Sequence, residues 1–158
     1  MSHKITILIG TMTGTAEMVA EDMKEAVEAD SDYQVILKPM DDLDAGVFDD
    51  DGLFIICTST YGQGDVPDNA RQFLEDLQDK KPDLSAVRFG LFGLGDDTYA
   101  DTFNHGGLTL EKVLRELGAV RLGEPCFHNA SGSQTAEDQG VEWVRGWLNE
   151  IKNQEQNT

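Results

Sequence analysis

The sequence predicts an α/β protein, a three-layer α/β/α sandwich in which helices cover both faces of a five-stranded parallel sheet. Five short runs of apolar and β-branched residues alternate with stretches in which apolar residues recur at helical spacing. The third run, GLFIICTS (52–59), is almost entirely apolar, as expected of a strand that is covered on both faces. The 158 residues suffice for one domain with a core of ordinary size.

The first half of the chain supplies three strands and two helices. The first strand is KITILIG (4–10), and a helix follows from Thr15 to about residue 29. The second strand is YQVILK (33–38) and the third is 52–59. Pro67 and Asp68 then open a helix that ends near the Lys80–Lys81–Pro82 stop.

The second half repeats this alternation. The fourth strand is VRFGLFGLG (87–95), and the next helix carries leucines from 108 to 117 and is closed by Gly118. The run AVRLGEPCF (119–127) indicates a single fifth strand. The last helix carries apolar residues from 141 to 151. We expect one domain over residues 1–152, and a polar tail, NQEQNT (153–158), that frays.

The charge balance is strongly acidic. The chain has 12 Lys and Arg against 30 Asp and Glu, a formal net charge of −18. Such a field repels nucleic acid and anionic membranes and favours basic partners, whose approach it steers. Solubility alone is the competing explanation. The acidic run 41–51 likewise fits either a solvated loop or a docking patch.

The two cysteines, Cys57 and Cys126, lie in or beside apolar segments without metal-ligand spacing. We expect small core residues rather than a disulfide, which suits a reducing compartment. The N-terminus has no long apolar segment, and no stretch approaches the roughly 18 apolar residues of a membrane span. These features predict a cytoplasmic protein, and we expect it to be a monomer.

Three unusual loops follow strands one, three and four: GTMTGTAE (10–17), TSTYGQGDVPDN (58–69) and GLGDDTYADTFN (93–104). In an open parallel sheet, ligands bind beyond the carboxyl ends of the strands. The first loop offers hydroxyls and helix N-terminal N–H groups to a phosphate, with Gly14 allowing close approach. It lacks the lysine of the ATP-binding loop and the glycines of the dinucleotide fingerprint, so it suits a phosphomonoester. A simple helix cap at Thr13 or Thr15 is the alternative.

Tyr61 and Tyr99 each lie in one of the other two loops. Either one alone fits a residue that anchors a surface loop. Together, two aromatic faces at one sheet edge are able to enclose a planar ring. A flat ligand that carries a phosphate therefore explains all three loops.

These loops, T-x-T-G-T, TYGQGDVPDN and GLGDDTY…FN, resemble the three FMN-binding loops of the flavodoxin family. They are especially similar to those of the FMN domains of diflavin reductases and of short MioC-like flavodoxins, to which KPDLSAVRFG (81–90) is also similar. The resemblance implies the flavodoxin-like strand order 2-1-3-4-5, FMN as cofactor, and a protein that shuttles single electrons through the hydroquinone/semiquinone couple.

The resemblance also implies a site, built from the three loops in turn. The phosphate would be bound by Thr11, Met12, Thr13, Gly14, Thr15 and Ala16; the ribityl chain and one ring face by Thr58, Ser59, Thr60, Tyr61, Gly62 and Gly64; and the other side by Leu94, Gly95, Asp96, Tyr99, Phe103 and Asn104. Tyr99 would stack on the ring, and the Gly62 carbonyl would accept a hydrogen bond from flavin N5–H in the semiquinone. No residue is assigned from HNASGSQTAED (128–138), where the diflavin reductases carry an acidic segment.

No catalytic constellation is evident, so the chemistry would belong to the cofactor. His3, His105 and His128 are scattered, and we expect only His105 near the site. The charge of −18, with Asp96 and Asp97 at the ring, would disfavour the anionic hydroquinone and lower its potential. Such a carrier implies a basic, NADPH-linked FAD reductase and an acceptor such as a haem-thiolate monooxygenase or a biosynthetic radical enzyme.

Three alternatives share this winding. One is an FMN-dependent NAD(P)H:quinone oxidoreductase, which the short, acidic chain without a second nucleotide fingerprint disfavours. A phospho-receiver domain needs an acceptor aspartate after strand three, where Thr58–Ser59 stand, and an acidic pair after strand one, where Gly10–Thr11 stand. The third is one half of a diflavin chain, but the start at MSHK and the polar end favour a free-standing carrier.

Overall fold

The computed structural model describes residues 4–10, 15–40, 43, 45–49, 52–59, 68–95, 105–129 and 135–156. The strands are β1 (Lys4–Gly10), β2 (Gln34–Pro39), β3 (Leu53–Ser59), β4 (Arg88–Gly95), β5 (Val120–Arg121) and β6 (Cys126–Asn129). The α-helices are α1 (Thr15–Asp30), α2 (Asp68–Lys80), α3 (His105–Glu116) and α4 (Ala136–Gln156), and a 3₁₀-helix, η2, spans Ala45–Asp49. These elements match the predicted alternation of strands and helices.

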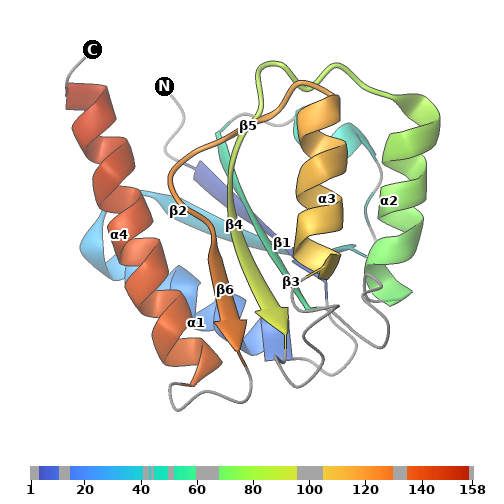
Figure 1. The fold of residues 1–158 in the computed structure, drawn as a ribbon. Helices are drawn as coiled ribbons and strands as arrows, with labels where there is room; N and C mark the ends of the chain where they lie inside the picture. Colours follow the sequence, from blue (N-terminus) through green and yellow to red (C-terminus); the bar gives the residue numbers. More distant parts are fainter. Residues whose placement is uncertain are drawn as a thin grey trace.

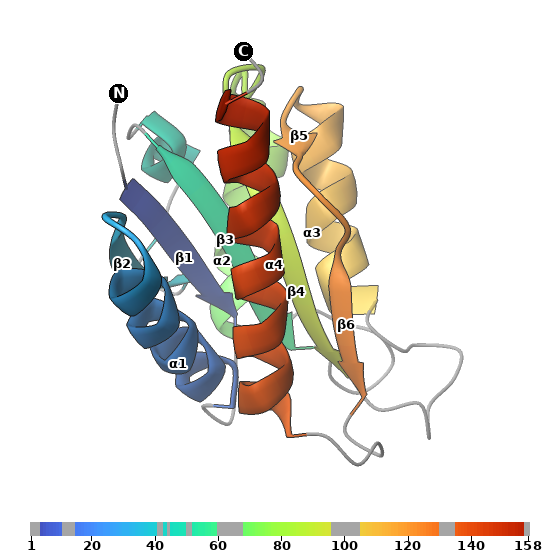
Figure 2. The same ribbon diagram turned by 90° about the vertical axis from the view of Figure 1, so that its left-hand side faces the viewer.

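The strands form one parallel sheet in the order β2-β1-β3-β4-β5, with β6 also paired to β4 (Figure 1). Helices α1 and α4 cover one face and α2 and α3 the other, which makes three layers (Figure 2). Both the predicted layering and the predicted strand order are therefore confirmed. The short crossovers produce this winding because a right-handed helical connection is the one that packs back onto the sheet.

Each strand divides its side chains between two apolar cores. From β1, Ile5, Ile7 and Ile9 face α1 and α4, whereas Leu8 packs on the opposite side with Phe73 of α2. This alternation follows from the two-residue period of a strand. Burial on both sides explains why the central strands are apolar nearly throughout.

The prediction of a single fifth strand over residues 119–127 is wrong. The chain leaves β4 after Arg121 and returns to it at Cys126, so β5 and β6 are separate short strands. Gly123 adopts φ +69°, in the left-handed region, and Pro125 has no N–H to donate to a ladder. The backbone therefore detours over residues 122–125 in place of continuing the strand.

The acidic run 41–51 is not only a solvated loop. Its described part contains η2, from which Val47 and Phe48 are buried. The Phe48 ring lies edge-on to Phe54, with 5.0 Å between ring centroids, and 5.9 Å from the ring of Phe73. Two apolar residues inside an acidic segment thus seal one end of the core beside α2.

The helix ends follow local chemistry. Gly118 has φ +106°; its N–H bonds to the Arg115 carbonyl, and the Ala119 N–H bonds to that of Leu114. This is the Schellman pattern, so the predicted closing glycine is confirmed. Helix α4 continues to Gln156.

Candidate functional site

The carboxyl ends of four strands meet at one edge of the sheet, the lower edge in Figure 1. Strands β1, β3, β4 and β6 end there at Gly10, Ser59, Gly95 and Asn129. All four α-helices begin at the same edge. Parallel pairing forces this arrangement, so the three loops singled out in the sequence start from neighbouring strands.

The strand register brings together predicted site residues that are far apart in sequence. Ser59 lies opposite Leu94, and Thr58 lies opposite Gly10, the residue directly before the predicted phosphate-binding stretch. Thr15 and Ala16 form the start of α1 at the same edge, and Gly95 ends β4. The remaining predicted residues lie outside the described ones: Thr11, Met12, Thr13, Gly14, Thr60, Tyr61, Gly62, Gly64, Asp96, Tyr99, Phe103 and Asn104.

Thr58 is fully buried just beneath the edge, and its side chain lies against Gly10. A Cβ on residue 10 would come 2.5 Å from Thr58 Oγ1 and 3.2 Å from Met40 Sδ. Gly10 is therefore required by close packing rather than by a special backbone angle. The contact fixes where the chain leaves β1, immediately before the predicted phosphate loop.

The first turn of α1 is held by the sheet below it. Ala16 is fully buried, and its carbonyl accepts a hydrogen bond from Cys57 Sγ at 3.5 Å. Burial raises the pKa of the Cys57 thiol to about 12, so the group remains a neutral donor at ordinary pH. Because the methyl of Ala16 lies in the core, the residue offers a ligand only its backbone N–H, one of the first four that have no partner within a helix.

A helix N-terminus held in this way has the chemistry that suits an anion. Its N–H groups and dipole favour a phosphate, and no described Lys or Arg belongs to the start of α1, where Glu17 is the charged residue of the first turn. Helix α4 also begins with acid, at Glu137 and Asp138. The edge thus combines the N–H groups at the start of α1 with acidic side chains in the first turns of α1 and α4.

His128 is a residue at this edge that the sequence analysis did not place there. It lies opposite Leu94 at the end of β6, is 7 % exposed, and its Nδ1 is 2.6 Å from Gln139 Oε1 on α4. The expectation that only His105 lies near the site is therefore wrong. A strand-end histidine followed eleven residues later by a helix glutamine gives no recognisable motif, so tertiary contact alone reveals the pair.

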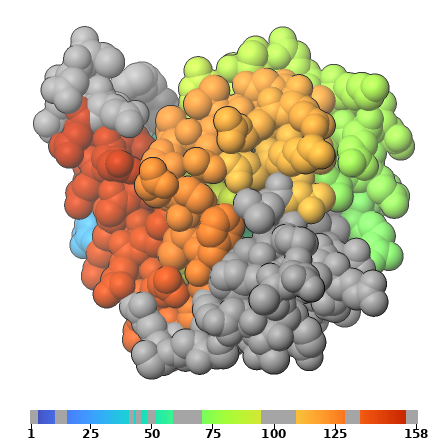
Figure 3. All heavy atoms as spheres, viewed as in Figure 1, coloured from blue at the N-terminus to red at the C-terminus, as the bar shows by residue number. Residues whose placement is uncertain are grey.

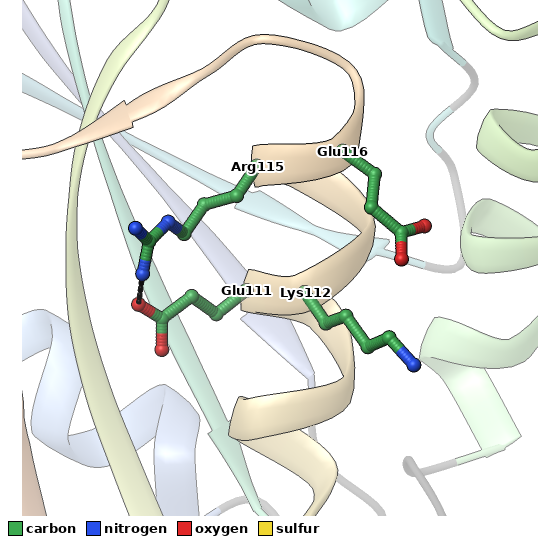
Figure 4. A pocket seen from close by; sticks show the side chains of 4 residues that line it. All are labelled: Glu111, Lys112, Arg115 and Glu116. Atoms are coloured by element: carbon green, nitrogen blue, oxygen red, sulfur yellow. Dashed lines mark ion pairs between the residues drawn. The ribbon is translucent and has the colours of Figure 1, made fainter.

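A hollow on α3 is not part of this edge. It measures about 470 Å³ and is lined by Glu111, Lys112, Arg115 and Glu116, all toward the far end of that helix (Figure 4). Glu111 is buried and forms an ion pair with Arg121, and a longer one of 3.6 Å with Arg115. This pair ties α3 to β5, and the charged lining is unsuited to a flat apolar ring.

Among the residues that the structure describes, no cluster of His, Cys, Asp and Glu side chains has the arrangement of a metal site. No helix in that part of the chain has the length and apolar character needed to span a membrane.

Comparison with known proteins identifies the family. The flavodoxin family model matches residues 7–144. The MioC protein of Escherichia coli (strain K12) is 40 % identical over 150 residues, which cover 94 % of this chain and 98 % of that protein. Human NADPH–cytochrome P450 reductase is 34 % identical over 145 residues, 89 % of this chain but 21 % of the reductase.

Solved structures agree with the sequence comparison. A cysteine-to-serine mutant of flavodoxin from Pseudomonas aeruginosa superimposes with a TM-score of 0.83 at 30 % identity. The match covers 94 % of this chain and 99 % of that one. The fold and the family are thereby established by independent comparisons.

Proposed function

This chain belongs to the flavodoxin family, and from that premise we propose that it binds FMN at the carboxyl edge of the sheet and carries single electrons between a reductase and an acceptor. The observation that carries the proposal is the convergence of the three loop-bearing strands β1, β3 and β4 at that edge. When bound, FMN would supply the one-electron oxidation and reduction, and the protein would supply binding, orientation and electrostatics. Carriers of this family are generally not enzymes.

The described residues fit the group. The N-terminus of α1 suits a phosphomonoester, since its N–H groups point toward the edge and the Cys57–Ala16 bond holds the first turn in place. The Gly10–Thr58 contact directs the chain into the phosphate loop, and the adjacent ends of β3 and β4 present the two loops that carry Tyr61 and Tyr99. Leu94, 6 % exposed, closes the core beneath that side.

The net negative charge indicates which class of partner protein the carrier binds. A net charge of −18 speeds the approach of a basic protein and lowers the stability of additional negative charge at the edge. We therefore place a basic, NADPH-linked FAD reductase upstream, and downstream a haem-thiolate monooxygenase or a biosynthetic radical enzyme. The free thiols of Cys57 and Cys126 are compatible with the cytoplasm as its compartment.

FMN addition to the purified protein tests the cofactor. We expect a yellow one-to-one complex in which the fluorescence of the flavin is quenched, because aromatic side chains would enclose the ring. Tyr99→Ala should weaken the complex by at least about tenfold, whereas Tyr33→Phe, a buried change away from the edge, should leave it unaltered. A protein that stays colourless, or equal affinity in both variants, contradicts the assignment.

Electron transfer is tested with cytochrome c, a basic haem protein. The reduced holoprotein should reduce it in single-electron steps, at a rate that falls steeply as salt screens the charges. NADPH alone, without a reductase, should leave the flavin oxidised. Direct NADPH oxidation would instead make the protein an enzyme and overturn the carrier assignment.

A further inference from the structure

The detour between β5 and β6 is filled by the two tryptophans of the chain, both on α4. Trp147 Nε1 donates a hydrogen bond to the Leu122 carbonyl at 2.8 Å, and Trp143 Nε1 donates one to the Glu124 carbonyl at 2.9 Å. The two carbonyls that lost a strand partner at the detour are thus satisfied by indoles. The tryptophans are fixed at their polar ends.

The indole rings also pack against the sheet. Gly90 of β4 lies under them, since a Cβ there would come 2.7 Å from Trp147 Cε2 and 2.9 Å from Trp143 Cη2. The two indoles stack with 5.8 Å between centroids and 23° between planes, and Trp143 also contacts the ring of Phe92. This rigid aromatic platform would lose little conformational entropy on binding a ligand.

A groove of about 300 Å³ lies over this platform. Its described lining is Glu124, Glu142, Trp143, Gly146, Trp147 and Glu150, and contains no basic residue. Trp147 is buried, Trp143 is partly exposed, and a Cβ on Gly146 would meet nothing within 4 Å, so the groove opens to solvent beside Gly146. Figures 2 and 3 show the adjoining walls, α4 and the segment that carries β5 and β6.

Arg145, the arginine of α4, is engaged away from the groove: it bonds to Asp30 of α1, with Nε 2.9 Å from Oδ2. Glu150 Oε2 lies 2.6 Å from the position of a Cβ on Gly123, which places that carboxylate against the detour. Glu142 is close enough to Cys126 for its charge to contribute to raising the pKa of that thiol, after burial, the larger cause.

We propose that this tryptophan groove receives an arginine side chain of the basic protein with which the carrier exchanges electrons, an inference that rests on the proposed function. A guanidinium stacks on an indole face and pairs with carboxylates in the same plane, whereas a lysine offers only a compact point charge. A second copy of this chain is disfavoured as occupant by the −18 charge that both copies would carry.

The position of the groove suits a second contact made by one partner. Trp143 lies seven residues and Glu150 fourteen residues into α4 from Ala136, which corresponds to about 10–20 Å from the carboxyl edge at 1.5 Å per residue. A partner surface of about 800 Å² spans that distance. An arginine in the groove would orient the partner while its redox group faces the edge.

Both tryptophans line the groove, so their fluorescence and indole N–H resonances report directly on occupancy. Hexa-arginine peptide, titrated into the FMN-loaded protein, should shift both indole cross-peaks and bind more tightly than hexa-lysine. Gly146→Leu should weaken binding by about fivefold, because it fills the groove without changing the charge. Asn153→Leu, an exposed change on the same helix, should leave the affinity within about twofold.

A charge-matched comparison separates the groove from general attraction. Glu124→Gln/Glu150→Gln and Glu25→Gln/Glu75→Gln each remove two exposed carboxylates, but only the first pair lines the groove. The groove pair should lose several-fold more affinity for hexa-arginine. Equal losses, or unmoved indole cross-peaks, overturn the proposal.

The flavin provides a separate readout in the same samples. Retained FMN absorbance with no groove effect would reject the arginine site and leave the carrier assignment intact. Failure to load FMN would reject the carrier assignment, while the tryptophan titration would still report on the groove itself.

Discussion

The side-chain oxygen of Thr58 lies where a side chain on Gly10 would begin, 2.5 Å from the position of a Cβ at that residue. The two residues are register partners on β1 and β3; Gly10 directly precedes the predicted phosphate-binding residues, and Thr58 is the first predicted FMN-binding residue after β1 and α1. One contact therefore sets the relative positions of two strand ends that lie almost fifty residues apart in the sequence.

Gly10→Ala should disturb this contact. The added methyl forces Thr58 or β1 to shift, which we expect to cost about 1–3 kcal/mol in the free energy of unfolding. FMN affinity should fall by about tenfold, because the phosphate loop leaves β1 at this residue. Urea unfolding and flavin titration measure the two effects.

The matched control is the double variant Gly10→Ala/Thr58→Ala, which removes the clashing hydroxyl. It should recover part of both losses in a double-mutant cycle. Strictly additive losses would mean that the two residues do not interact across the strand pair.

Gly62 is proposed to present its carbonyl to the flavin ring, although it lies outside the described residues. Gly62→Ala should hinder the peptide rotation that this requires, because alanine disfavours positive φ. We expect the first one-electron potential of bound FMN to shift by about 60 mV, the equivalent of a tenfold change. Gly64→Ala in the same loop is the control, and equal shifts in both variants would contradict a specific role for Gly62.

The His128–Gln139 pair should contribute to stability at the edge. Gln139→Leu leaves a buried imidazole nitrogen without its partner, which we expect to cost about 1–3 kcal/mol in chemical unfolding. His128→Leu/Gln139→Leu removes both polar groups and should cost less than the sum of the two single changes. Additivity would show that the 2.6 Å contact contributes nothing in solution.

The buried thiol of Cys57 should make the protein less stable at alkaline pH. Its pKa is raised by burial from 9.0 to about 12, so the unfolded chain releases this proton first as the pH rises. The contribution of the neutral Cys57 thiol to the free energy of unfolding is complete below pH 9.0 and disappears as the pH approaches 12. Between about pH 8 and about pH 10, the native protein should lose about 1.4 kcal/mol more stability than Cys57→Ala does.

The half-buried Cys126 provides the internal comparison. Alkylating reagents should modify Cys126 in the folded protein while Cys57 remains protected, and mass mapping distinguishes the two. Parallel stability curves for the native protein and Cys57→Ala would contradict a buried, neutral thiol.

Local pattern was sufficient for most of the fold. The apolar runs predicted the central strands to within one residue, and Gly118 predicted its helix end, because burial on both faces and a left-handed closing residue leave direct traces in sequence. The three loops also indicated their own edge, since the carboxyl ends of parallel strands meet there. Their order along the chain was enough to indicate the family.

What the sequence by itself determined was the central strands, the alternation with four α-helices, the winding of the sheet and the residue types of the loops. Only the tertiary structure revealed that Thr58 packs on Gly10, that His128 meets Gln139, and that the fifth strand breaks where two indoles replace its lost hydrogen bonds. Each of these joins residues on different elements, and no periodicity records such a contact. Local propensity acts within a few residues, whereas close packing and the satisfaction of buried polar groups depend on what the completed fold places nearby.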